Sequence, residues 1–309
     1  MSEIKVYQLD DVAALKTIND FIRWAASRFS EAQLFYGHGT DNAIDEALTI
    51  VLSILYLQHG TPESLLAANV TEDEKQRLLN AINTRLNDRK PAAYIIRESW
   101  FAGLPFYVDE RVLIPRSPIA ELIERQFEPW VDSEQVNSIL EIGAGSACIA
   151  IASALYFPNA HVTAVDISKE ALAVAEINVN RHHCEGHVTL VESDLFTALD
   201  DDQRFDIIVS NPPYVSEEEY HALPPEYRCE PALGLLAEDE GLAIIERILS
   251  QASDYLTPEG IIVVELGNGQ GALIDRYPDV PFVWLDFERG GSGVFLLRRE
   301  DLTAFEERG

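Results

Sequence analysis

From residue 118 to the C-terminus, short apolar stretches alternate with stretches of helical pattern. The short stretches predict strands at 138–142, 162–166, 188–192, 205–210 and 261–265, and the others predict helices at 119–127, 148–156, 169–181 and 241–256. Because most of these strands are too continuously apolar to face water on one side, they predict a parallel sheet covered by helices on both faces. Two further strands, at 282–287 and 293–297, flank a short glycine-rich turn and predict a terminal antiparallel pair. The fold class is therefore α/β, with a mostly parallel seven-stranded sheet.

Residues 1–95 follow a different pattern, that of a small all-α domain. Apolar side chains recur at helical spacing within 20–29 and 44–57, and either Asp41 or Asn42 is expected to cap the second of these helices. Thr71 opens the sequence TEDE, which is a capping box. Residues 96–117 are aromatic and β-branched and are interrupted by Gly103 and Pro105, so they predict a β-hairpin linker. We thus expect a helical domain at 1–95, a hairpin at 96–117 and an α/β domain at 118–309.

The charge of the chain is strongly unbalanced. It has 23 Lys and Arg against 52 Asp and Glu, a formal net charge of −29. A phosphate backbone repels such a surface, so general affinity for nucleic acid is not expected. The excess fits either a solvated surface adapted to salt or a cationic partner.

Composition also bears on location and on metal binding. No apolar run reaches the ~18–20 residues of a membrane span, and the first residues have no apolar segment typical of a secretory signal. The three cysteines form no CxxC pair, which favours reduced thiols and a cytoplasmic protein. His182 and His183 are adjacent but have no cysteine or carboxylate at ligand spacing, so we expect no metal.

The first candidate site is the turn that follows the strand at 138–142. It reads Glu141-Ile142-Gly143-Ala144-Gly145, and its two glycines allow the backbone to approach a ligand closely. Neither a complete GxGxxG nor the GK[ST] of a phosphate-binding loop is present. By itself the turn is a weak signal, and a tight strand–helix connection is the alternative.

The next two strands also end in polar residues. Asp166 lies 21 residues beyond Gly145, where a carboxylate can accept hydrogen bonds from both ribose hydroxyls of a nucleoside; its alternative role as a helix cap is better filled by Ser168. Asp194 and Leu195 follow the third strand and can border an adenine ring, although a simple loop is an equal alternative. The set predicts a dinucleotide or an adenosine-type cofactor.

The most informative segment is Asn211-Pro212-Pro213-Tyr214, directly after the strand at 205–210. The prolines fix the backbone and hold Asn211 extended, at the sheet edge where ligands bind in such folds. A planar amide or amine nitrogen fits this segment: the Asn211 side-chain oxygen and the Pro212 carbonyl each accept one N–H, while Tyr214 stacks on the planar group. Such a site accelerates a reaction mainly by alignment.

Together, the glycine turn, the strand-end acid and NPPY resemble the class I S-adenosylmethionine-dependent methyltransferases, a Rossmann-like family, that alkylate planar nitrogens. The likeness is most specific to the HemK/PrmB-type protein-glutamine methyltransferases and covers almost the whole chain. The segments YGHGTDN (36–42), WFAGLPFYVDERVLIPRSPI (100–119) and LPPEYRCEPALGLLAEDEGL (223–242) look like the branch that methylates a glutamine of large-subunit ribosomal protein L-three. The release-factor branch usually has PRPET where this chain has PRSP.

The resemblance implies roles for individual residues. S-adenosylmethionine would be bordered at its methionine part by Glu141, Gly143, Ala144 and Gly145, at its ribose by Asp166, and at adenine by Asp194 and Leu195. The target glutamine amide would be held by Asn211, Pro212, Pro213 and Tyr214, with Phe101 and Arg116 closing the pocket from the hairpin side. The helical domain would dock the substrate, a basic ribosomal protein; neither a membrane nor specific DNA binding is expected.

The chain departs from the family's usual DxGTGSG turn. Glu141 stands for the Asp, Ala144 for the Thr and Ala147 for the last Gly. A methyl group fits at 147 if that position serves helix packing more than a positive φ. The alternative activities are methylation of a release-factor glutamine, DNA adenine methylation, and a non-catalytic ribosome-assembly role. DNA methylation would call for a basic groove that this chain lacks.

Overall fold

The computed structural model describes residues 5–306, which form two compact units. The first unit takes the chain up to Ser99 together with Pro224–Cys229, and the second takes Trp100–Leu223 and the residues from Glu230 onward. The hairpin predicted at 96–117 thus falls largely within the second unit. Residues 224–229 lie outside the unit that the sequence pattern assigned to them.

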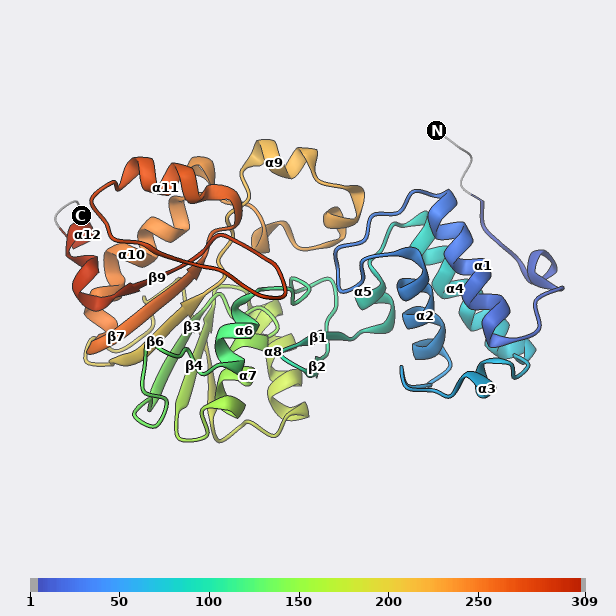
Figure 1. The fold of residues 1–309 in the computed structure, drawn as a ribbon, viewed down its shortest axis with the longest axis horizontal. Coiled ribbons are helices and arrows are strands. Elements are labelled where there is room, and N and C mark those ends of the chain that lie inside the picture. The colour runs from blue at the N-terminus through green and yellow to red at the C-terminus, as the bar shows by residue number, and fades with distance from the viewer. Residues whose placement is uncertain (1–4, 307–309) are drawn as a thin grey trace. The chain divides into compact units, whose positions relative to one another are not determined.

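The first unit is helical. Its elements are η1 (Leu9–Val12), α1 (Ile18–Glu31), α2 (Ala43–Ile54), α3 (Glu63–Leu66), α4 (Glu72–Asn87), α5 (Ala92–Ile96) and η2 (Pro225–Cys229) (Figure 1). Asn42, and not Asp41, caps α2 by accepting from the N–H groups of Ile44 and Asp45. The capping box predicted at Thr71 is present, with Glu74 as its acidic member. Buried apolar side chains of α1, α2 and α4 form one core.

A group of charged side chains is buried within this helical unit. Arg85 of α4 is 1% exposed and contacts Glu46 of α2 at 2.7 Å and Glu226 at 3.4 Å. Arg85 also donates to the Phe35 carbonyl at 2.8 Å, and the Phe35 N–H donates to Glu226 at 3.0 Å. Burial raises the pKa of Glu46 despite the attraction of Arg85. The ion pairs therefore hold residues 224–229 among the helices.

The second unit is built on the predicted seven-stranded sheet. Its strands lie in the order β5-β4-β3-β6-β7-β9-β8, and all neighbours are parallel except β7 with β9 and β9 with β8. The strand bounds are β3 (Ser138–Ile142), β4 (His161–Asp166), β5 (Val188–Glu192), β6 (Phe205–Ser210), β7 (Leu256–Glu265), β8 (Val283–Leu285) and β9 (Val294–Arg298). A separate two-stranded sheet pairs β1 (Ser99–Phe101) with β2 (Leu104–Phe106). The terminal antiparallel pair is confirmed.

Helices cover both faces of the seven-stranded sheet (Figure 1). The helical elements of this unit are α6 (Ile119–Glu124), α7 (Cys148–Tyr156), α8 (Lys169–Arg181), α9 (Glu217–Ala222), η3 (Ala232–Gly234), η4 (Asp239–Gly241), α10 (Ala243–Tyr255), η5 (Gly267–Gly269), α11 (Gln270–Arg276), η6 (Arg299–Leu302) and α12 (Thr303–Glu306). No helix in residues 5–306 is long and apolar enough to cross a membrane. The fold is that of a doubly covered α/β domain.

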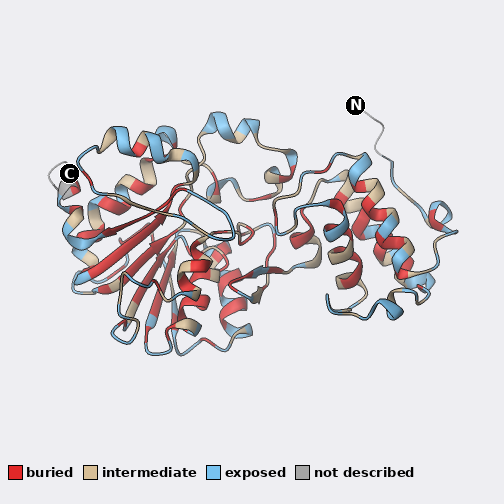
Figure 2. Cartoon of the chain, viewed as in Figure 1, coloured by how far each residue is buried: buried red, intermediate tan, exposed pale blue. Residues whose placement is uncertain are grey.

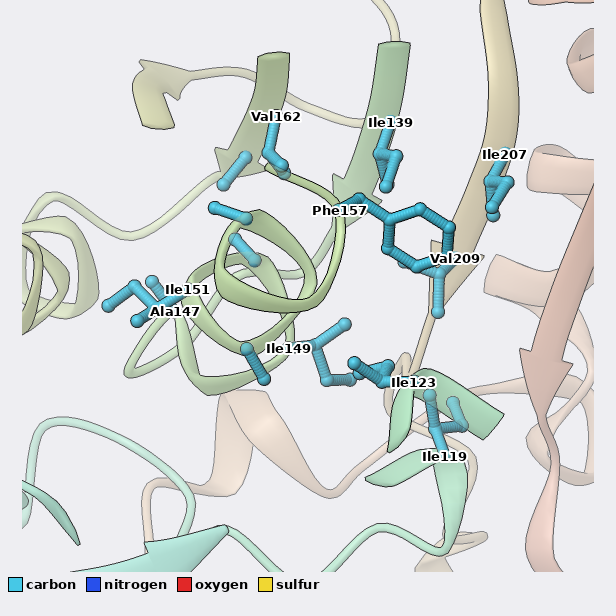
Figure 3. Close-up of a cluster of buried hydrophobic side chains, with 14 of the residues drawn as sticks. Ile119, Ile123, Ile139, Ala147, Ile149, Ile151, Phe157, Val162, Ile207 and Val209 are labelled. Carbon is cyan, nitrogen blue, oxygen red and sulfur yellow. The ribbon is translucent and has the colours of Figure 1, made fainter. Parts of the chain in front are cut away.

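Successive strand residues supply two separate apolar cores. Ile139 belongs to the core beneath α6 and α7, while Leu140 belongs to the core beneath α10. Figure 3 shows Ile139, Val162 and Ile207 pointing from their strands toward the side of α7. The central strands β3 and β6 are buried along most of their length, whereas the outer helix faces are exposed (Figure 2). Since side chains alternate between faces, each strand needs apolar residues at nearly every position, which is the pattern read in the sequence.

Candidate active site

A cavity of about 260 Å³ lies at the carboxyl ends of β3, β4, β5 and β6. This is the edge where parallel sheets bind ligands, because the turns that follow the strands converge there. Nearly all of the residues singled out in the sequence line it: Arg116, Glu141, Gly143, Ala144, Gly145, Asp166, Asp194, Leu195, Asn211, Pro212 and Pro213. The geometry thus brings together four turns that are far apart in the chain.

The glycine turn forms one wall of the cavity. Gly143 and Gly145 have φ of +79° and +53°, a conformation that L side chains rarely adopt. The N–H groups of Gly143 and Ala144 both donate to the Val165 carbonyl, at 2.9 and 3.0 Å. Because a Cβ on Gly145 would meet no atom within 4 Å, that residue is needed for its backbone conformation and leaves the space beside it open.

Ala147, at the start of α7, also has a positive φ, of +59°. A methyl group was expected to fit at 147 if the position serves helix packing more than a positive φ. That condition is not met. The side chain is fully buried, so the fold accommodates the methyl group. The left-handed conformation of this alanine costs about 1–2 kcal/mol.

Asp166 joins the glycine turn to the end of β4. One carboxylate oxygen accepts from the Gly145 N–H at 2.8 Å and the other from the Ser168 N–H at 2.8 Å. Burial raises the pKa of Asp166, while these hydrogen bonds oppose the rise. Ser168 fills the capping role expected of it by accepting from the Ala171 N–H. The Asp166 carboxylate is thus fixed in the cavity wall, and each oxygen retains a lone pair for a ligand hydroxyl.

Glu141 is the most deeply buried acid of the cavity wall, at 1% exposed. Its carboxylate accepts from the Ala150 N–H at 2.8 Å. Burial raises its pKa well above the usual value, and the charge of Asp166 adds to the rise. Burial, together with the charge of Glu141, also raises the pKa of the neighbouring Cys148 thiol, which disfavours its nucleophilic thiolate form.

The turn after β5 places Asp194 beside a cation that the sequence did not reveal. Arg247 of α10 donates to the Asp194 carboxylate at 2.8 Å, and both residues line the cavity. Leu195 follows with φ of +53°, and its carbonyl accepts from the Ser193 hydroxyl at 2.8 Å. The position of Arg247 on a helix far along the chain is why no local pattern predicted it.

The NPPY segment forms a neighbouring part of the cavity wall. Asn211, Pro212 and Pro213 line the cavity, but Tyr214 is not among its lining residues. Tyr214 instead packs partly into the second apolar core and donates its hydroxyl hydrogen to Glu265 at 2.9 Å. The side chain predicted to stack on a planar substrate group therefore lies beside the cavity and not in its wall.

The hairpin side contributes one of its two predicted residues. Arg116 lines the cavity and pairs with Glu230 through two contacts of 2.6 and 2.8 Å, while the Ile114 N–H donates to the same carboxylate. Phe101 does not line the cavity: it is 4% exposed and packs edge-on against Phe106 in the first apolar core. Its aromatic character, which suggested a pocket wall, serves the interior of the domain instead.

The comparisons with known proteins identify the family of the chain. A methyltransferase small domain family model matches residues 127–223. A ribosomal protein uL3 glutamine methyltransferase of Francisella tularensis subsp. tularensis is 43% identical over 301 residues, 97% of this chain and 96% of that protein. The chain belongs to this glutamine methyltransferase family. A relative with the same name from Xanthomonas campestris pv. campestris is 46% identical over 294 residues, 95% of each chain.

The solved structures support the fold of this methyltransferase. The hMettl16 catalytic domain in complex with MAT2A 3′UTR hairpin 1 aligns with a TM-score of 0.51 and 16% identity over 90% of both chains. At that identity the likeness concerns the fold alone. Within residues 5–306, no group of three or more His, Cys, Asp or Glu side chains could hold a metal ion.

Proposed function

We propose that this methyltransferase transfers a methyl group from S-adenosylmethionine to the side-chain amide nitrogen of a glutamine in ribosomal protein uL3. The observation that carries the proposal is the presence of Asn211-Pro212 in the same cavity as the glycine turn and Asp166. The names of relatives at 43% and 46% identity support the substrate.

The cavity walls fit S-adenosylmethionine. Gly145 presents backbone with open space beside it, Asp166 offers carboxylate lone pairs to ribose hydroxyls, and Leu195 supplies an apolar contact for adenine. Glu141 lies behind the glycine turn, near the expected methionine part. When bound, the cofactor supplies an electrophilic methyl group on a sulfonium.

The chain's own task is to orient a poor nucleophile. An amide nitrogen shares its lone pair with its carbonyl, so it reacts only when it is held in line with the methyl group. The Asn211 side-chain oxygen and the Pro212 carbonyl would each accept one amide N–H and leave the lone pair directed at the methyl carbon. As the N–C bond forms, the carbon–sulfur bond of the sulfonium breaks and leaves a neutral thioether. The nitrogen becomes acidic and loses one proton to solvent, so no strong base is required. Alignment of this kind can lower a barrier substantially.

The experiment supplies labelled S-adenosylmethionine with free uL3, a release factor or duplex DNA in parallel. We expect label in uL3 alone, at a glutamine located by mass spectrometry. Label in the release factor or in DNA would assign the enzyme to that substrate instead, and label in none would contradict the proposal.

A substitution tests the role of the NPPY segment. Asn211→Ala should lower kcat by up to ~100-fold, because one of the acceptors that align the amide is lost. Cofactor affinity measured by calorimetry should stay unchanged. Asn180→Ala, an exposed asparagine of α8, is the matched control and should keep wild-type kcat. Full activity in Asn211→Ala would refute the role given to Asn211.

The net charge of −29 fits a substrate that is basic before RNA covers it. If the acidic surface attracts uL3, the association rate should fall steeply as salt increases. A rate that does not respond to salt would assign the charge to surface adaptation alone.

A further inference from the structure

Glu265 is a buried carboxylate that the alignment mechanism does not use. It is the last residue of β7 and is 7% exposed. One of its oxygens accepts from the Tyr214 hydroxyl at 2.9 Å, and the other accepts from the Ser117 hydroxyl at 2.5 Å. Leaving a carboxylate in the interior is unfavourable unless such partners compensate it, so a side chain needed only for packing would be apolar here.

Tyr214 is also enclosed by two glycines with positive φ. A Cβ on Gly267 would lie 2.5 Å from a ring carbon of Tyr214, and a Cβ on Gly241 would lie 2.2 Å from its carbonyl oxygen. Neither position can take a side chain without moving the tyrosine. The ring, the hydroxyl and the backbone carbonyl of Tyr214 are thus each held by a different neighbour.

The position of Glu265 in the sheet explains how it could act on the reaction site. Strands β6 and β7 are parallel neighbours in which Ser210 pairs with Val264. Glu265 therefore ends its strand at the same sheet edge at which Asn211 begins the NPPY segment. A group on a strand end is held more precisely than one on a loop, which makes it a suitable anchor for the loop beside it.

We propose that Glu265 is a positioning residue for methyl transfer, which fixes Tyr214 and through it the geometry of the NPPY segment. The inference rests on the proposed function, since it concerns the alignment of the same glutamine amide. The second hydroxyl bond extends this alignment to the Ser117 segment, whose neighbour Arg116 lines the cavity. Glu265 itself does not line the cavity, whereas its partner Ser117 does, and it acts through these two hydroxyl groups.

Steady-state kinetics with uL3 test the proposal. Glu265→Gln keeps the size of the side chain but replaces one acceptor oxygen by an amide donor. We expect kcat to fall about tenfold, while KM for uL3 and the cofactor dissociation constant stay within about twofold. Tyr214→Phe, which removes only the hydroxyl, should lower kcat by a similar factor, and the double variant should be no slower than either single variant. Glu192→Gln, at the exposed end of β5, is the matched control and should keep wild-type kcat.

A second measurement does not depend on activity. In protein labelled with ¹³C-tyrosine, the signal assigned to Tyr214 by its loss in Tyr214→Phe should shift in Glu265→Gln and stay in place in Glu192→Gln. A proposed function that is wrong would leave uL3 unmethylated but keep this shift. The positioning role is overturned by wild-type kcat in Glu265→Gln, by losses that multiply in the double variant, or by an unmoved Tyr214 signal. If Glu265→Gln does not fold, full kcat in Tyr214→Phe overturns it instead.

Discussion

Replacing Arg85 by Met should destabilise the helical unit by about 3–5 kcal/mol. Arg85 is 1% exposed and its two carboxylate partners, Glu46 and Glu226, are 2% and 0% exposed. Methionine fills most of the space but leaves both acids without this cation. Glu46 then keeps the Thr40 hydroxyl at 3.1 Å, and Glu226 keeps the Phe35 N–H and Arg89 at 3.6 Å. These contacts are too few to compensate two buried negative charges, so the loss should approach the upper part of the range.

Native-state hydrogen exchange read by mass spectrometry measures this loss for each unit separately. Peptides from α2 and α4 should lose protection in Arg85→Met, whereas peptides from β6 and β7 in the other unit should not. Arg28→Met on α1 is the matched control, because within residues 5–306 the ion pair of Arg28 is with Glu31, which is 66% exposed. A surface pair of that kind contributes about 0.2–1 kcal/mol.

The loss in Arg85→Met should also depend on pH. Burial already raises the pKa of Glu46, and removal of the guanidinium raises it further, so the acid becomes neutral as pH falls. Urea unfolding should therefore show a larger difference between Arg85→Met and wild type at about pH 8 than at about pH 5. A loss no larger than that of Arg28→Met, or one of equal size at both pH values, would refute the argument that buried charge is responsible.

Three further predictions concern the α/β unit. The raised pKa of Glu141 means that its ionised form is disfavoured in the folded state. Stability is therefore lost as pH rises from the pKa of Glu141 in the unfolded chain through its pKa in the folded protein. Urea unfolding should show that wild type loses stability relative to Glu141→Gln over that pH interval. Hydrogen bonds from Arg111 lower the pKa of Asp109 to about 2. The contribution of Asp109 to stability is therefore present above its pKa in the unfolded chain and is lost as pH falls through about 2. In acid unfolding, Asp109→Asn should lack this loss of stability. Ala147→Gly relieves the left-handed strain but removes a buried methyl group, and these two effects nearly cancel. It should therefore change the free energy of unfolding by less than about 1 kcal/mol. Ala147→Val keeps the strain and adds bulk to a buried site, so it should lower the free energy of unfolding by at least about 1–3 kcal/mol. Equal effects of Gly and Val in thermal unfolding would contradict the strain argument.

The elements of the α/β unit could be predicted closely because local pattern and final environment agree. The strands at 138–142, 188–192 and 205–210 and the helices at 148–156 and 169–181 have the predicted bounds. β3 and β6 lie in the middle of the sheet, and their mostly apolar sequences match burial on both faces. β7 begins earlier than predicted, at Leu256, because its first residues include Thr257, Pro258 and Glu259, which no apolar pattern marks as a strand.

The placement of residues 224–229 could not be predicted, since it depends on pairing between side chains far apart in the sequence. Glu226 is separated from Arg85 by 141 residues, and the sequence around each residue does not indicate which residue pairs with it. The same limit applies to Arg247 with Asp194 and to Glu230 with Arg116. Glu265 is different: it is an acid at the end of a predicted strand, the same signal that singled out Asp166, and it could have been found by that rule.

These pairings change the meaning of the acidic composition. The formal charge of −29 counts every Asp and Glu as ionised, yet several of the acids in residues 5–306 are buried: Glu46, Asp109, Glu121, Glu141, Glu226, Glu230 and Glu265. Glu141, Glu230 and Glu265 lie around the cavity, where they hold backbone N–H groups, an arginine or hydroxyl groups in place. Glu141 and Glu265 have raised pKa values because they are buried. A basic substrate would therefore meet a smaller negative charge than the sequence count implies. Substitution of Glu141 or Glu265, whose ionised forms are disfavoured by burial, should leave the salt dependence of uL3 binding unchanged.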